Sequence, residues 1–275
     1  MMRWITRLAL VALVGVLYVS HANAQGALPI ISSGGIVNAA SFTPAPNNPA
    51  SPCALISIFG ESLAAGSDSA TMIPLPRSIN GTQVFINNIA SPLIFVSPSQ
   101  INAQVPCEVT PGSTINVFVQ VGSLPGPLEA LQIQAATPGV FSVTQNGMGA
   151  GAILHANFTL VDSNSPVVAG ETILIFCTGL GETVSPQIQT GEAGNGQLTL
   201  QTPTVTIGGQ NAQVVFSGAA PGFVGLYQIN VIVPNFSGGD PELLIDLAGQ
   251  RSRNGIIVPT NTSPVVESSR YSQVQ

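Results

Sequence analysis

The clearest pattern along the chain is an alternation of apolar and polar residues that occurs twice. Residues 100–106 read Gln-Ile-Asn-Ala-Gln-Val-Pro, and residues 228–234 read Gln-Ile-Asn-Val-Ile-Val-Pro. Such alternation predicts a β-strand with one buried face. The proline ends the strand because it has no amide hydrogen to donate to a neighbour. We therefore expect one structural element that is used twice.

Further matches between the two halves keep the same order and predict a tandem duplication. With the offset of each pair in parentheses, they join residues 35–42 to 151–158 (116), 57–63 to 174–180 (117), 84–88 to 205–209 (121) and 100–106 to 228–234 (128). Because the offsets only grow, the second copy is expected to carry loop insertions.

Each copy has the pattern of an immunoglobulin-like β-sandwich, with about seven short strands and frequent turn signals. In the first copy, Asn87-Asn88 separates two apolar strands and predicts a tight hairpin turn. No helical periodicity of useful length follows the amino-terminal segment. The predicted fold is all-β, with two tandem sandwich domains at residues 25–145 and 146–259, a glycine-rich linker at 147–151 and a flexible tail at 260–275.

The amino terminus has the three parts of a secretory signal peptide. Arg3 and Arg7 precede an apolar run over residues 8–19, and Ala22-Asn23-Ala24 forms a small-residue cleavage site. A transmembrane anchor is the alternative, but the run is short for one. We predict a signal peptide at residues 1–24, cleavage near Ala24, and a secreted or periplasmic chain without stable membrane insertion.

Charge is sparse and acidic, which argues against nucleic-acid binding. Only 7% of the residues are charged, and the formal net charge is −6. All six basic residues are arginine, whereas binding to phosphates needs clustered lysine and arginine. An apolar fraction of 45% is enough for a real core, so disorder is not expected.

The cysteines favour a disulfide in the first domain. Cys53 and Cys107 have Gly170 and Asn235 as counterparts in the second copy, so the fold does not require either cysteine. Two such cysteines in one domain of a secreted chain predict a Cys53–Cys107 disulfide, with two free thiols as the alternative. Cys177 is expected to be a small buried apolar residue.

Catalysis by a serine hydrolase is not favoured. Ser62 lies in Gly-Glu-Ser-Leu-Ala, which faintly resembles a nucleophile elbow, but no helix pattern follows it. After signal cleavage His155 is the only histidine, and its counterpart is Ala39. We therefore expect a structural His155 and no enzyme, although a hydrolase using Ser62 stays open as a hypothesis.

Metal and sugar sites also have weak signals, and neither a metal nor a cofactor is predicted. Residues 162–165 (Asp-Ser-Asn-Ser) and 239–242 (Gly-Asp-Pro-Glu) offer oxygen ligands for calcium, but the same residues are common in turns. The mature chain has no tryptophan, and Tyr227 lies in a core strand motif. A stacking platform for sugars is therefore disfavoured.

Several longer motifs resemble one known family. They are residues 34–42 (Gly-Gly-Ile-Val-Asn-Ala-Ala-Ser-Phe), 55–60 (Leu-Ile-Ser-Ile-Phe-Gly), 96–106 (from Val-Ser-Pro to Gln-Val-Pro), 137–141 (Thr-Pro-Gly-Val-Phe) and 220–230 (from Ala-Pro-Gly to Gln-Ile-Asn). They resemble the Solibacter uncharacterised C-terminal domain family, and each half is loosely similar to IPT/TIG immunoglobulin-like domains. The resemblance implies a secreted bacterial module with no catalytic residues to transfer.

Together these observations predict a secreted, non-catalytic structural or adhesive module. Its expected partner is an extracellular protein or a cell-surface component, bound at sheet edges or end loops. An extracellular carbohydrate-binding module is the alternative.

Overall fold

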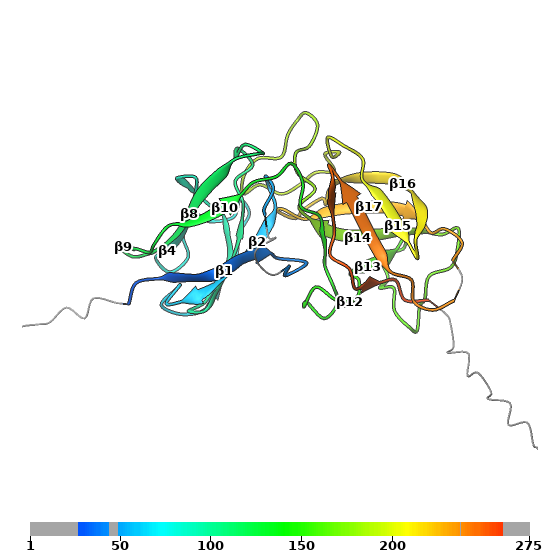
Figure 1. Ribbon diagram of the computed structural model, residues 1–275, viewed down its shortest axis with the longest axis horizontal. Helices are drawn as coiled ribbons and strands as arrows, with labels where there is room; N and C mark the ends of the chain where they lie inside the picture. Colours follow the sequence, from blue (N-terminus) through cyan, green and yellow to red (C-terminus); the bar gives the residue numbers. More distant parts are fainter. Residues whose placement is uncertain (1–26, 44–48, 237, 261–275) are drawn as a thin grey trace, which may run out of the picture.

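The chain folds entirely into β-structure (Figure 1). The computed structural model describes residues 27–43, 49–236 and 238–260. These residues form twenty strands and no helix, and among them no helix is long and apolar enough to cross a membrane. The predicted signal peptide and nearly all of the predicted tail lie outside the described residues. The strands build two sandwiches, sandwich 1 (β1–β10) and sandwich 2 (β11–β20), side by side.

Sandwich 1 consists of two antiparallel sheets. One has the order β1 (Ile30–Asn38), β2 (Leu55–Glu61), β7 (Gln100–Gln104), β6 (Leu93–Val96) and β3 (Asp68–Ser69). The other has the order β10 (Glu129–Gln132), β8 (Thr114–Val121), β4 (Thr82–Ile86) and β5 (Ile89–Ala90), with β9 (Leu124–Pro125) paired to β8. A buried apolar cluster fills the space between them.

Sandwich 2 repeats this topology in one continuous sheet. Its order is β11 (Gly139–Val140), β14 (Thr172–Thr178), β17 (Tyr227–Ile232), β16 (Gln210–Ala219), β15 (Thr204–Ile207), β18 (Leu243–Leu247) and β19 (Gln250–Arg251), with β13 (Ile153–His155) also paired to β14. A short second sheet joins β12 (Gly149–Ala150) to β20 (Ile256–Ile257). The single strand β16 corresponds to both β5 and β6 of sandwich 1. It pairs with β15 at one end and with β17 at the other.

The predicted hairpin at Asn87-Asn88 is confirmed. Both asparagines have positive φ, 52° and 61°, and connect β4 to β5. The equivalent turn of sandwich 2 uses Gly208-Gly209, at 58° and 77°. Both pairs tolerate the left-handed conformation that this turn needs. The predicted strand beyond the first turn is interrupted at Ser91-Pro92, because the chain leaves one sheet there and joins the other.

The second sandwich begins earlier in the chain than predicted. Val140 of β11 pairs with Cys177 as Ile31 of β1 pairs with Gly60, so β11 corresponds to the first half of β1. The glycine-rich stretch 147–151, predicted as a linker, instead contributes β12 to the sheet with β20. The boundary at residue 145 was misplaced because an insertion divides the first strand of the second copy.

The predicted disulfide lies where the two sandwiches meet. Cys53 and Cys107 are bonded, with their Cα atoms 4.4 Å apart, and Cys53 belongs to the apolar cluster that forms the core of sandwich 2. Beside the bond, the Cys107 amide donates to Thr190 Oγ1 at 2.8 Å. The bond therefore stabilises the surface of sandwich 1 on which sandwich 2 packs.

Buried hydrogen bonds tie the same junction together. Thr178 Oγ1 accepts from the Leu55 amide at 2.9 Å and donates to the Gly225 carbonyl at 2.8 Å. Gln104 Oε1 accepts from the Gly191 amide at 2.8 Å. Since buried polar groups are costly to leave unpaired, these contacts hold the sandwiches in one relative orientation.

Candidate binding face on the second sandwich

The glutamine and asparagine of the repeated strand lie on the outside of each sandwich. In β17, Ile229 and Val231 point into the core, while Gln228 and Asn230 are partly exposed on the opposite face. Gln228 Nε2 donates to Asn230 Oδ1 at 2.8 Å. Gln100 and Asn102 of β7 make the same bond at 2.9 Å. The repeated residues thus include an outward-facing amide pair besides the core.

A phenylalanine lies directly across the sheet from each of these amides. In sandwich 2, Phe176 pairs with Gln228 and Phe216 pairs with Asn230. In sandwich 1, Phe59 pairs with Gln100 and Phe95 pairs with Asn102 in the same register. Side chains on one face of directly paired residues are in contact range. Each outer face therefore combines aromatic rings with amide groups.

On sandwich 2 this face is hollowed into an open groove of about 690 Å³. We call it the phenylalanine groove; it is lined chiefly by Leu154, Phe158, Phe176, Phe216, Phe223, Leu226, Gln228 and Asn230. Phe158 is 70% exposed and Phe223 is 58% exposed. Large apolar side chains gathered in a concave surface with a few polar groups are typical of binding sites.

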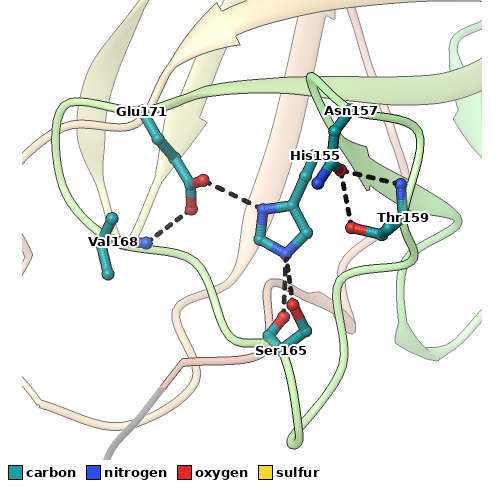
Figure 2. A network of polar contacts seen from close by, with 6 residues as sticks. All are labelled: His155, Asn157, Thr159, Ser165, Val168 and Glu171. Carbon is teal, nitrogen blue, oxygen red and sulfur yellow. Dashed lines mark hydrogen bonds and ion pairs between the residues drawn. The ribbon is translucent and has the colours of Figure 1, made fainter.

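Phe158 is held in an unusual backbone conformation at the tip of a short hairpin. Its φ is +66°, and its counterpart Phe42 has φ +49°. A bulky residue in the left-handed region is uncommon and costs free energy. In Figure 2, Asn157 Oδ1 accepts from the Thr159 amide at 3.0 Å and from its hydroxyl at 2.7 Å. These bonds fix the tip that presents Phe158.

The base of this hairpin is fastened by His155 (Figure 2). His155 Nδ1 lies 3.0 Å from Glu171 Oε2, and Nε2 lies 3.0 Å from the Ser165 carbonyl and 3.1 Å from its hydroxyl. Glu171 Oε1 also accepts from the Val168 amide at 2.6 Å. The imidazole therefore ties the end of β13 to two points of the connection that leads to β14.

The neighbours of His155 favour its protonated form. A carbonyl and a carboxylate can only accept hydrogen bonds, so the imidazole satisfies both when it carries two protons. Burial opposes this charge, but the Ser165 carbonyl and Glu171 outweigh burial and raise the pKa of His155 above its usual value of 6.5. The network is therefore a charged clasp on the hairpin.

The sequence pattern does not show that Ser165 and Glu171 meet at His155, because it does not reveal how the connection between β13 and β14 folds back on β13. The contacts from Ser165 to His155 and from His155 to Glu171 resemble a catalytic triad. However, His155 Nε2 also faces the Ser165 carbonyl and must donate a hydrogen bond to it. A general base needs this nitrogen unprotonated. Ser62, at φ +55°, follows β2 in sandwich 1, whereas His155 lies on β13 of sandwich 2.

The other candidate residues from the sequence, Cys177, Asp162 and Asp240, are each buried or hydrogen-bonded within the fold. Cys177 is free and fully buried in the core of sandwich 2, as predicted, and burial raises the pKa of its thiol. Asp162 Oδ1 accepts from the Asn164 and Ser165 amides at 2.7 and 2.8 Å. Asp240 Oδ1 accepts from the Thr260 amide at 2.9 Å. In the described part of the chain, no cluster of three or more potential metal ligands occurs.

The fold defines a tandem immunoglobulin-like β-sandwich protein. No protein-family model and no curated protein matches the chain. Among solved structures it is similar to a surface glycan-binding protein, SGBP-B, from a Bacteroides ovatus mixed-linkage glucan utilization locus, in complex with a heptasaccharide. The two are 12% identical with a TM-score of 0.32, and the match covers 79% of this chain and 43% of that one.

Two further solved structures are also similar to the chain. The surface glycan-binding protein PbSGBP-B of Prevotella bryantii is 12% identical with a TM-score of 0.27, over 83% of this chain and 41% of that one. Domains 5–6 of the S-layer protein SbsC are 9% identical with a TM-score of 0.27, over 85% and 100%. This chain thus spans less than half the length of these two glycan-binding proteins.

Proposed function

We propose that the chain is an extracellular, non-catalytic structural or adhesive module that binds a protein partner through the phenylalanine groove. The observation behind this proposal is the pair Phe158 and Phe223, both more than half exposed in the phenylalanine groove. Removing such rings from water is the main source of affinity in protein contacts. Membership of the Solibacter C-terminal domain family is part of the proposal.

Export from the cytoplasm is supported by the Cys53–Cys107 bond, since structural disulfides persist in oxidising compartments. The junction between the sandwiches supports a structural role. It packs the disulfide against the core of sandwich 2 and adds buried hydrogen bonds, so that the groove is presented on a rigid body.

A pull-down from the cell surface tests the proposal. Wild type and the double variant Phe158→Ser/Phe223→Ser would be compared, with Met72→Ser, an equally exposed apolar residue of sandwich 1, as the control. We expect the double variant alone to lose the partner. Equal capture by all three proteins would contradict a role for the groove.

Carbohydrate binding is a second candidate, favoured by the amides of Gln228 and Asn230 beside aromatic rings. Amide groups donate to and accept from hydroxyls. Saturable sugar binding on a glycan array that Gln228→Ala/Asn230→Ala abolishes would replace the adhesive proposal. A hydrolase is tested with model esters. Activity that disappears in Ser62→Ala or Ser165→Ala would refute the non-catalytic part.

A further inference from the structure

Phe158 lies inside a short loop that the imidazole of His155 closes (Figure 2). At the tip, the Phe158 amide donates to the His155 carbonyl and the His155 amide donates to the Thr159 carbonyl, both at 2.9 Å. Ten residues after His155, the Ser165 carbonyl lies 3.0 Å from its Nε2. One side chain therefore closes the segment that presents Phe158 in the phenylalanine groove.

Glu171 holds the other ring nitrogen and joins the loop to the body of the sandwich. Its Oε2 lies 3.0 Å from His155 Nδ1, and its carbonyl accepts from the amide of Val233, a core residue just after β17, at 2.9 Å. The side chains of His155 and Glu171 are only 13% and 24% exposed, so their contact is screened less than a surface ion pair. The imidazole thus fastens the loop to the strands beneath it.

The full clasp needs two protons on the imidazole. The Glu171 carboxylate and the Ser165 carbonyl can only accept hydrogen bonds, and a neutral imidazole has a single N–H to donate. One of the two acceptors therefore loses its bond when His155 loses a proton. Of the described titratable groups, Glu171 and Asp162 act on the imidazole. Burial lowers the pKa of His155, but the Ser165 carbonyl, Glu171 and, most weakly, Asp162 raise it above its usual value.

The first sandwich lacks this clasp. Ala39 stands in the place of His155, and the counterpart of Phe158 is Phe42, which has the same left-handed backbone. Phe42 packs on Phe59, with ring centroids 6.3 Å apart, whereas Phe158 is 70% exposed. The copy with the more exposed ring is thus the copy whose loop is held by a titratable group.

We infer that His155 is a pH switch for the phenylalanine groove: the doubly protonated imidazole fixes the loop that presents Phe158, and loss of one proton releases this loop. The inference rests on the proposed function, because it concerns the regulation of the same groove. The left-handed backbone of Phe158 costs free energy, so the loop leaves this conformation more readily once a tether is lost. Because the folded-state pKa of His155 is raised, the loop is held below the usual value of 6.5 and is released as the pH rises through the folded-state pKa. The groove therefore loses affinity as its surroundings become more alkaline.

Amide hydrogen exchange on the exported chain, followed by NMR between about pH 5 and pH 8, tests the switch without any ligand. The protection factors of the Phe158 and His155 amides should fall by roughly tenfold as His155 loses its proton, as expected for one lost hydrogen bond to a charged group. Glu171→Gln should move this fall to lower pH together with the His155 midpoint. Asp246→Asn, which breaks the ion pair with Arg251, is the control and should leave the midpoint in place. Protection factors that stay constant while His155 titrates would overturn the inference.

A pull-down from one cell-surface preparation at the two ends of this pH range separates the inference from the proposed function. Wild type should capture less partner at the higher pH, whereas capture by His155→Gln should not change with pH. If Phe158→Ser/Phe223→Ser loses the partner but wild-type capture is equal at both pH values, or if His155→Gln follows wild type, only the switch is wrong. If the double variant captures as much as wild type at both pH values, the proposed function fails, whatever the exchange of the hairpin amides shows.

Discussion

Loss of the Cys53–Cys107 disulfide should destabilise both sandwiches together. The perturbation is Cys53→Ala/Cys107→Ala, which opens a loop with a sequence separation of 54. In the chain-entropy model a loop of this length stabilises the fold by about 4 kcal/mol. If m in urea is about 3 kcal/mol/M, the unfolding midpoint should fall by about 1.3 M.

The assay uses two signals that report different regions. Far-UV circular dichroism follows both sandwiches, whereas tyrosine fluorescence in a Tyr271→Phe background reports on Tyr227, which is buried in sandwich 2. Because Cys53 packs against the core of sandwich 2, the fluorescence of Tyr227 should shift with the circular dichroism. Wild type reduced with a phosphine is the control and should match the double variant.

A particular result would refute this reasoning. If circular dichroism shows an early transition while the Tyr227 signal keeps its wild-type midpoint, the disulfide stabilises sandwich 1 alone. The contact between the bond and the second core would then carry no free energy, and the two sandwiches would unfold independently.

Three further predictions concern the junction, the clasp and the buried thiol. In urea unfolding, Gly225→Ala should lower the free energy of unfolding by about 1–2 kcal/mol more than Gly222→Ala does. Both glycines have positive φ, but only at Gly225 would an added Cβ clash with a neighbour, the Leu55 side chain at 2.5 Å. The NMR titration midpoint of His155 should lie above 6.5 and fall in Glu171→Gln. Because its folded-state pKa is raised, the clasp should stabilise the fold below pH 6.5 and lose this effect as the pH rises through the folded pKa. Cys177, buried and with a raised thiol pKa, should react with a thiol reagent only after unfolding, and rapid labelling of the folded chain would contradict the described core.

The sequence could predict the class of fold because its patterns are local. Alternation in 100–106 and 228–234 identifies strands with one buried face, and Asn87-Asn88 identifies a hairpin. Counterpart residues also agree in conformation: Cys53 has φ +62° where the second copy has Gly170 at +86°. The predicted boundary at residue 145 lies after β11, because this strand has only two residues and shows almost no alternation. An insertion also separates it from β13.

The candidate site could not be predicted in this way, because its residues meet only in three dimensions. His155 ends β13, and Ser165 and Glu171 lie in the connection from β13 to β14, whose path the sequence pattern does not show. The groove needs the register of three strands, which places Phe176 opposite Gln228 and Phe216 opposite Asn230. No single segment shows that these rings and amides share one surface.

Comparison of the two copies leads to a different rule for finding function in this chain. The disulfide occurs in one copy only and lies at the junction between the sandwiches. The shared rings and amides face outward in both sandwiches. What differs is the exposure of one ring: Phe42 is partly exposed and packs on Phe59, whereas Phe158 is 70% exposed. The repeated outer surface thus presents more exposed aromatic area on the second sandwich than on the first, although its rings and amides are the same in both.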